Sequence, residues 1–160
     1  MADKKEKLRP KISDRFTNWQ PPEIENGKLT KWNWMVQNKE GLKLGYRTDI
    51  GAFTYINALH GVELGDHVQI GSHCSIYSTS TIDDKHGKIV VKENARIGSH
   101  SIVMPGVTIG KNAVIGAFSF VNKDIPDDVI AYGVSAKIIR PLTEQEIKDM
   151  RKEIDAQKRK

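Results

Sequence analysis

The most regular feature of the chain is an aliphatic position that returns every sixth residue. Read from Val91 in blocks of six, every block opens on Val or Ile, and its fifth place holds a small or β-branched residue. A helix repeats its apolar face every 3.6 residues and a half-buried strand every two. A period of six therefore predicts a solenoid of stacked short repeats. The opening positions are Val91, Ile97, Val103, Ile109, Ile115 and Val121, and the fifth positions are Ala95, Ser101, Val107, Ala113 and Ser119.

The same pattern extends upstream in two shorter sets. One set opens at Leu44, Ile50 and Ile56, and after a slip of two residues another opens at Leu64, Ile70, Ile76 and Ile82. Three residues are then inserted around residues 83–88 before the pattern resumes. Three blocks form one coil of about 18 residues, so we predict a parallel β-helix over residues 44–126. Inward aliphatic side chains fill such a prism, and ligands are expected on its outside, at insertions or between subunits.

The flanking segments do not follow the repeat. Residues 1–43 form a basic tail and an aromatic-rich segment that contains Trp19, Trp32 and Trp34. Three tryptophans carry too much apolar surface to remain in water. We expect the segment to include a short strand at 32–36 and to cap the open end of the prism; the alternative is an aromatic wall for a sugar or an adenine.

The C-terminal segments have a different character. Residues 127–142 are expected to form a closing loop, and residues 143–160 a helix that begins with a capping box at Thr143 and Glu146. Ile147, Met150 and Ile154 give this helix one narrow apolar stripe.

Composition narrows the class of protein. The 160 residues suit one domain, and the formal net charge of +5 fits an anionic ligand as well as a nucleic acid. The basic tail lacks the clustering and the aromatic residues of a nucleic-acid arm, so no nucleic-acid partner is expected. The single cysteine, Cys74, excludes an internal disulfide, and its fifth position in a block predicts a small buried residue. No apolar run reaches 18 residues and no signal peptide is visible, so we expect a cytoplasmic protein without membrane insertion.

Two runs of sequence resemble a known family. Ile97–Pro126, with its Ile-Gly-Ser-His, Met-Pro-Gly-Val and Ile-Gly-Lys-Asn elements, and Ala131–Arg140 resemble the hexapeptide-repeat acyltransferases. The nearest branch is that of the galactoside, maltose and xenobiotic O-acetyltransferases, together with small N-acetyltransferases of amino-sugar nucleotides. The resemblance covers about residues 44–140. It implies a left-handed β-helix, a homotrimer, and acetyl-CoA as acyl donor in a groove between adjacent prisms, with a sugar or amino-sugar nucleotide as acceptor.

By motif position, the resemblance also implies the contacts to CoA. Small residues at two of these positions would let the extended pantetheine run along the prism, and three cations would meet the phosphates. The chain departs from the family at Ser135, where a proline is usual. The positions implied are Ser99, Ala117, Asn122, Lys123, Lys137 and Arg140.

The catalytic base is where the chain departs most from the family. Acyl transfer to a hydroxyl or amine needs a group that takes the acceptor's proton. The family's histidine aligns near residues 81–83, where this chain has none. We expect His86, in the inserted loop, to be the base, with Asp83 either orienting it or serving as the base itself; the remaining possibility is another histidine, His60, His73 or His100.

The acceptor side is implied by Tyr55-Ile-Asn-Ala58, which resembles the family segment whose asparagine contacts the acceptor sugar. Asn57 is therefore the acceptor-binding candidate, with His60 close by.

Two rival functions remain open at this stage. One is a carbonic anhydrase-like hexapeptide-repeat protein, in which histidines from two subunits bind a metal. The other is a non-catalytic scaffold subunit. No metal is expected in the favoured interpretation, because no histidine pair has a spacing that converges ligands.

Overall fold

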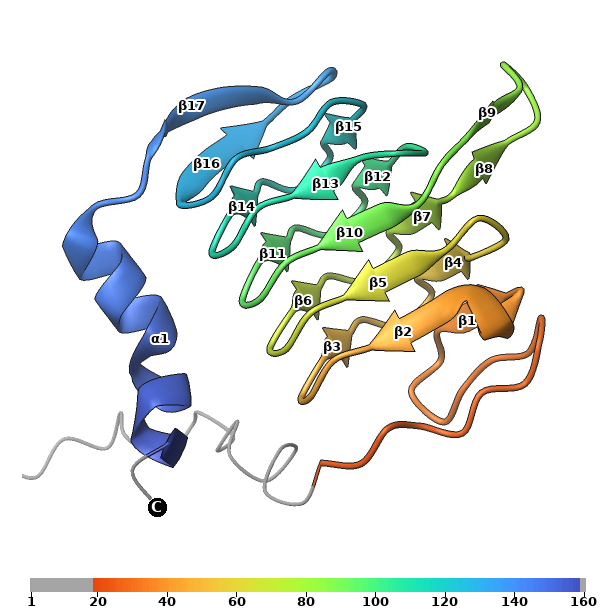
Figure 1. The fold of residues 1–160 in the computed structure, drawn as a ribbon, viewed down its shortest axis with the longest axis horizontal. Coiled ribbons are helices and arrows are strands. Elements are labelled where there is room, and N and C mark those ends of the chain that lie inside the picture. The colour runs from red at the N-terminus through yellow and green to blue at the C-terminus, as the bar shows by residue number, and fades with distance from the viewer. Residues whose placement is uncertain (1–18, 159–160) are drawn as a thin grey trace, which may run out of the picture.

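The computed structural model describes residues 19–158, which wind into a left-handed parallel β-helix with a helix beside it (Figure 1). Three parallel sheets form the faces of the prism, and each coil contributes one strand to each sheet in turn. Sheet A contains β1 (Met35–Gln37), β4 (Tyr55–Asn57), β7 (Ser75–Tyr77), β12 (Ile102–Val103) and β15 (Phe120–Val121). Sheet B contains β2 (Leu42–Leu44), β5 (Val62–Leu64), β10 (Ile89–Val91) and β13 (Thr108–Ile109). Sheet C contains β3 (Asp49–Ile50), β6 (Gln69–Ile70), β11 (Arg96–Ile97), β14 (Val114–Ile115), β16 (Val129–Tyr132) and β17 (Lys137–Pro141).

The period of six is explained by the register of these strands. Val91 pairs with Ile109, one coil of 18 residues later (109 − 91), and Ile56 pairs with Ile76 across sheet A. Like therefore stacks on like, and the aliphatic positions from Val91 to Val121 are all buried in the prism. Cys74 is also buried, and burial raises the pKa of its thiol, so its role is packing.

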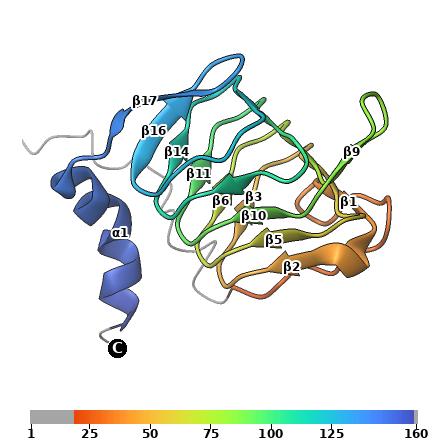
Figure 2. The same cartoon turned by 45° about the horizontal axis from the view of Figure 1, so that its top comes forward.

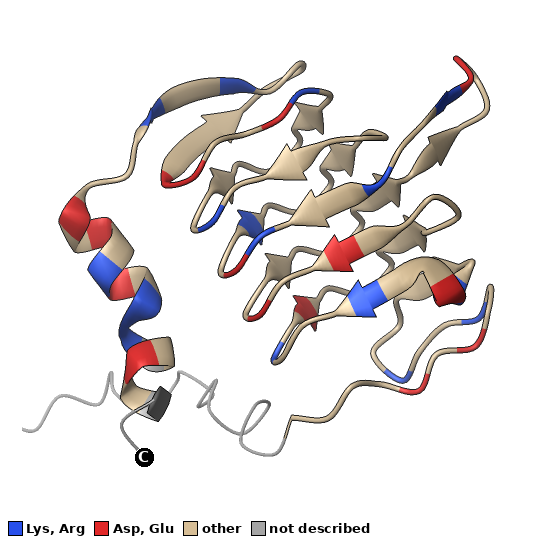
Figure 3. Cartoon of the chain, viewed as in Figure 1, with Lys and Arg blue, Asp and Glu red and all other residues tan. Residues whose placement is uncertain are grey.

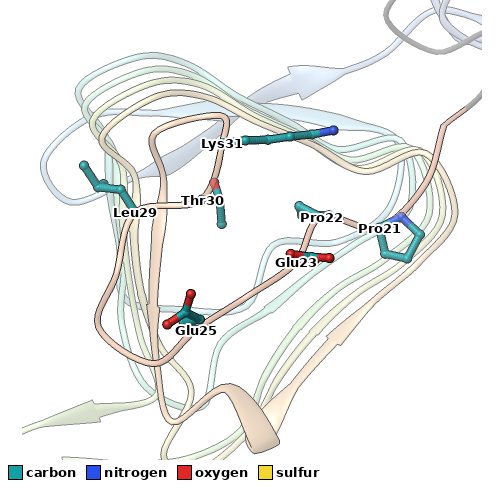
Figure 4. A pocket seen from close by; sticks show the side chains of 7 residues that line it. All are labelled: Pro21, Pro22, Glu23, Glu25, Leu29, Thr30 and Lys31. Carbon is teal, nitrogen blue, oxygen red and sulfur yellow. The ribbon is translucent and has the colours of Figure 1, made fainter.

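The N-terminal end departs from the expected boundary. The first coil begins at Met35, before Leu44, because β1 and β2 already pair in register with β4 and β5. Trp34 is 2% exposed and belongs to the buried core at this end of the prism. Figure 4 looks onto this end, where the segment before β1 lines a hollow of about 390 Å³. Its lining residues are Pro21, Pro22, Glu23, Glu25, Leu29, Thr30 and Lys31.

The C-terminal end is more regular than predicted. The segment expected as a closing loop contains β16 and β17, which pair antiparallel and extend sheet C. The following helix, α1 (Glu144–Lys158), begins with the expected capping box: Glu146 N donates to Thr143 Oγ1 at 3.2 Å and Thr143 N to Glu146 Oε2 at 2.8 Å. No helix among residues 19–158 is long and apolar enough to cross a membrane.

Helix α1 lies along the corner where sheet B turns into sheet C (Figure 2). Ile154 is buried, and Arg151 donates to Asn112 Oδ1 at 3.3 Å and to Glu93 Oε1 at 3.2 Å. The helix is tied to β17 by a second arginine. Arg140 forms a bidentate ion pair with Glu146, in which Nη1 donates to Oε2 at 2.8 Å and Nη2 donates to Oε1 at 2.7 Å. These contacts fix α1 at two places along its length.

The insertion is a hairpin that stands off the corner between sheets A and B. It contains β8 (Thr79–Ser80) and β9 (Lys85–His86), paired antiparallel. The expectation that Ile82 opens a buried block is wrong, because the side chain is 96% exposed at the hairpin tip. The chain leaves the prism after the buried Ser78, so the insertion is longer than the three residues predicted from the spacing.

The close stacking of successive coils can be tested with a single substitution. A Cβ at Gly98 would stand 2.4 Å from the backbone nitrogen of Ala117 on the next coil, which is far inside van der Waals contact. We expect Gly98→Ala to lower the free energy of unfolding by about 1–3 kcal/mol, the usual cost of overpacking. Urea denaturation measures it, with Lys43→Ala on the exposed side of β2 as a control that changes it by less than about 0.5 kcal/mol. Equal stability of the two variants would contradict the observed coil spacing.

The Arg140–Glu146 pair predicts that the stability of the fold decreases at acidic pH. Its hydrogen bonds lower the pKa of Glu146 to about 2 from an ordinary 4.5. A carboxyl with a depressed pKa stabilises the fold above its ordinary value, and this contribution fades as pH falls through the folded value. We expect the melting temperature of Glu146→Gln to lie below wild type above pH 5 and to converge with it near pH 2.

The matched control is Glu144→Gln, which removes a carboxylate from the same helical turn. We expect it to leave the pH dependence close to that of the wild type. Parallel melting curves for wild type and Glu146→Gln across the whole pH range would contradict the prediction.

Candidate functional site

A hollow of about 500 Å³ lies on the outer face of sheet A, at the base of the β8–β9 hairpin. The prism interior is filled, and this outer hollow offers space next to chemically varied side chains. Its lining comes from four neighbouring strands of sheet A and from the hairpin. The lining residues are Asn57, Tyr77, Thr79, Ser80, Thr81, Ile82, Asp83, Ile102, Met104 and Phe120.

One side of the hollow is polar. Asn57 Oδ1 accepts hydrogen bonds from Asn38 Nδ2 and from the backbone nitrogen of Leu59, both at 3.1 Å, so its amide is held in one orientation. Beside it, the rings of Tyr55 and Tyr77 lie 5.9 Å apart. Burial raises the pKa of Tyr55, and its hydroxyl donates to Gln37. The orientation of Asn57 is thus set before any ligand arrives, as binding of a polar group requires.

The opposite side is apolar. Ile102 and Met104 flank the buried Val103 on one coil, and Phe120 precedes the buried Val121 on the next, so all three point outward. Ile82, at the hairpin tip, adds a further apolar surface across the opening. A ligand in this hollow would meet amide and hydroxyl groups along one edge and hydrocarbon along the other.

The hairpin brings one carboxylate to the hollow. Asp83 lines it, and the Lys85 ammonium lies 2.9 Å from its Oδ2. A hydrogen bond from Ser80, followed by that from Lys85, lowers the pKa of Asp83. Figure 3 shows acidic and basic positions next to one another at this tip. Asp83 therefore stands in the hollow as an anion at neutral pH.

The structure does not bring His86 to Asp83. In the hairpin, Ser80 pairs with Lys85 and Thr79 pairs with His86, and adjacent residues of a strand face opposite ways. The contact of Asp83 with Lys85 puts the carboxylate on one side of the hairpin. His86 stacks instead on His60, with ring centroids 4.8 Å apart, at the corner between sheets A and B. The expected arrangement in which Asp83 orients His86 therefore does not form within this chain, and neither histidine lines the hollow.

The positions implied for pantetheine lie at another corner, where sheet C turns into sheet A. Ser99 and Ala117 occupy the same place on successive coils, since Phe118 N donates to Ser99 O at 3.0 Å. The next residues in the chain form an aromatic column along this corner: His73 and His100 stack at 4.8 Å, and His100 and Phe118 stack at 4.8 Å. His73 and His100 are thus exposed corner residues engaged with rings above and below.

The three implied cations do not converge within one chain. Lys137 begins β17 opposite Tyr132, at the end of the strand nearest the column, whereas Lys123 follows β15 toward the corner between sheets A and B. Arg140, at the other end of β17, is held by Glu146. Asn122 and Lys123 are exposed, as are Lys137 and Arg140. A phosphate could bind the ammonium groups of the two lysines. The guanidinium of Arg140, in contrast, already binds a carboxylate.

Asn57 and Asp83 were predicted from the sequence, but most residues that line the hollow were not. Tyr77, Ile102, Met104 and Phe120 each lie one residue from a buried aliphatic on a strand of sheet A. The sequence did contain a signal, namely the residue type at these outward positions of the repeat. They carry large side chains, whereas the outward position 75 carries a small serine. Among residues 19–158, no three His, Cys, Asp or Glu side chains gather in a way that could hold a metal ion.

Comparison with known proteins agrees with the repeat and the fold. A model of the bacterial transferase hexapeptide (six repeats) matches residues 88–123. The galactoside O-acetyltransferase of Lactococcus lactis is 40% identical over 103 residues, which cover 58% of this chain and 50% of that relative. The chain thus spans half the length of this relative.

Two solved structures have the same fold. A hexapeptide-repeat acetyltransferase of Vibrio cholerae, solved with acetyl-CoA, superposes with a TM-score of 0.66 at 28% identity, covering 69% of this chain and 66% of that one. A galactoside acetyltransferase solved with CoA gives a TM-score of 0.66 at 29% identity, covering 71% and 62%. The resemblance seen in the sequence is confirmed: this chain is similar to the hexapeptide-repeat acetyltransferases in its repeat and in its fold.

Proposed function

We propose that this protein is an acetyl-CoA-dependent acetyltransferase whose acceptor, a sugar or an amino-sugar nucleotide, binds in the hollow on sheet A. The observation that carries the proposal is the hollow itself, in which the fixed amide of Asn57 faces an apolar wall on the outside of a filled prism. Sugars present hydroxyl groups at their edges and C–H groups on their faces, which suits this division. Two of the relatives are named galactoside O-acetyltransferase, which supports a carbohydrate acceptor.

The donor-binding side fits CoA in its chemistry. Ser99 and Ala117 are small residues that follow one another up a corner of the prism, so an extended chain can lie against them. Lys123 and Lys137 are exposed cations, suited to phosphate. Asn122 adds an exposed amide next to Lys123. When bound, acetyl-CoA supplies the activated acetyl group, and the protein supplies position and a place for the acceptor's proton.

The assembly belongs to the same proposal. The hollow and the corner with Ser99 are both open to solvent on a single prism, and direct transfer requires two substrates held in contact. A second copy of the chain packed against sheet A would provide the missing wall. We therefore propose a homotrimer with one site at each interface.

The first test concerns the donor. We expect Lys137→Ala to raise KM for acetyl-CoA about tenfold, the loss of one charge-assisted contact, and to change KM for the acceptor much less. Release of free CoA thiol, followed at varied acetyl-CoA, measures this effect. Lys148→Ala, which removes a charge from the exposed side of α1, is the control. A Lys137→Ala enzyme with unchanged KM for acetyl-CoA would contradict the phosphate contact.

The second test concerns the assembly. One chain has a mass of 18.0 kDa. Sedimentation equilibrium is expected to give a single species of three times that mass. Replacement of an apolar residue on the open face, Ile102→Asp, should dissociate it and remove activity together, because a charge would be buried without a partner. A fully active monomer would contradict the shared site.

A further inference from the structure

The hollow holds one carboxylate and no histidine. Among its ten lining residues, Asp83 is the only acid, and the other polar members are amide or hydroxyl groups. The two histidines nearest in the fold, His60 and His86, stack on each other at the neighbouring corner. On the wall that this chain supplies, the composition differs from what transfer to a sugar hydroxyl requires, since a hydroxyl needs a base of near-neutral pKa in contact with it.

Asp83 is arranged to bind a cation. Its carboxylate accepts from Ser80 and from Lys85 at the hairpin tip. Two carboxylate oxygens offer about four acceptor sites, so positions remain on the side that lines the hollow. The side chain is 37% exposed and can be reached from there. Across the hollow, Asn57 supplies a fixed amide and Ile102 an apolar surface.

We infer that the acceptor is a primary amine carried on a sugar, and that Asp83 is the catalytic residue that binds its nitrogen and receives its proton. This inference rests on the proposed acetyltransferase function and names the acceptor class at the same site. It sets the protein apart from the O-acetyltransferases that it resembles in sequence.

The chemistry of the amine makes a carboxylate sufficient. An alcohol keeps its proton at neutral pH, and a carboxylate with a depressed pKa is too weak a base to remove it readily. A sugar amine is in part uncharged near neutral pH, and its nitrogen lone pair is then already nucleophilic. The nitrogen turns acidic only as the new bond forms, and a weak base next to it can accept the proton at that stage.

The transfer of the acetyl group needs no reactant other than the amine and acetyl-CoA. The lone pair of the neutral amine attacks the carbonyl carbon of the thioester, the C–N bond forms and the C–S bond breaks. Sulfur leaves with the bonding electrons as the thiolate of CoA. One N–H proton passes to the Asp83 carboxylate and from there to the thiolate, so the products are an amide and free CoA.

A matched pair of acceptors tests the inference. Wild-type protein is given acetyl-CoA and either a nucleotide-linked amino sugar or the same nucleotide sugar with hydroxyl in place of the amine. Mass spectrometry identifies the acetylated product, and CoA release gives the rate. We expect kcat/KM to be at least 100-fold higher for the amine, with acetyl found on nitrogen.

Two neighbouring carboxylates provide matched variants. Asp83→Asn should lower kcat/KM for the amine by about 10²–10⁴-fold, the span of general-base catalysis, while thermal stabilisation by CoA stays as in wild type. Asp84→Asn is the control: Asp84 lies at the same tip with a left-handed φ of 51°, which asparagine tolerates, and it does not line the hollow. We expect it to keep wild-type activity.

The outcomes separate the inference from the proposed function. Faster transfer to the hydroxyl sugar, or an Asp83→Asn enzyme that retains its activity on the amine, would overturn the inference and leave the acetyltransferase proposal standing. Loss of activity on both acceptors in His86→Gln, with Asp83→Asn active, would assign the base to His86 instead. If CoA neither stabilises the wild type nor is released with any acceptor, the proposed function itself fails.

Discussion

The structure depends on the hydrogen bonds that join each coil to the next. These bonds set the distance between coils to that of paired parallel strands, about 4.8 Å. This spacing puts Val91 over Leu64 and under Ile109, and it leaves no room for a Cβ at Gly98. Because aliphatic side chains fill the interior from end to end, binding chemistry is confined to the outer faces and the corners. The hollow on sheet A, the aromatic column and the docked helix each occupy one of those outer positions.

The repeat could be predicted from sequence because it depends on stacking alone. The inward first position of each block packs against the same position of another coil and must be aliphatic, and Ile97, Ile109 and Ile115 obey this without reference to the rest of the chain. Ile82 shows the limit of the rule. It has the right residue type at the right spacing, yet it stands in water, because the chain leaves the prism after Ser78. Spacing cannot tell a missed repeat from an insertion that carries an isoleucine by coincidence.

The site was predictable only in part, for a related reason. Asn57 could be named from a short local motif, whereas Met104 and Phe120 line the hollow only because their coils stack beside that of Asn57. The pairing of His86 with Asp83 was a prediction from proximity in sequence, and three residues in a loop carry no information about which side of a hairpin each one faces. The pairing Ser80 with Lys85 and Thr79 with His86 decides this, and it separates the two groups. Arg140 likewise matched a phosphate-binding position, and the carboxylate that occupies it comes from the next element of the chain.

The hairpin is closed at its base by the prism, where Gly87 N donates to Ser78 O at 2.9 Å. Its two ends are therefore fixed by coil stacking, whatever lies between them, and the entropic cost of a longer loop grows only with the logarithm of its length. Residues 79–86 can thus change in length and composition without loss of the hydrogen bonds that hold the coils together. Under the proposed function, acceptor selectivity is in this sense decoupled from foldability: one prism with one donor-binding corner would serve different acceptors through the exchange of a single surface loop.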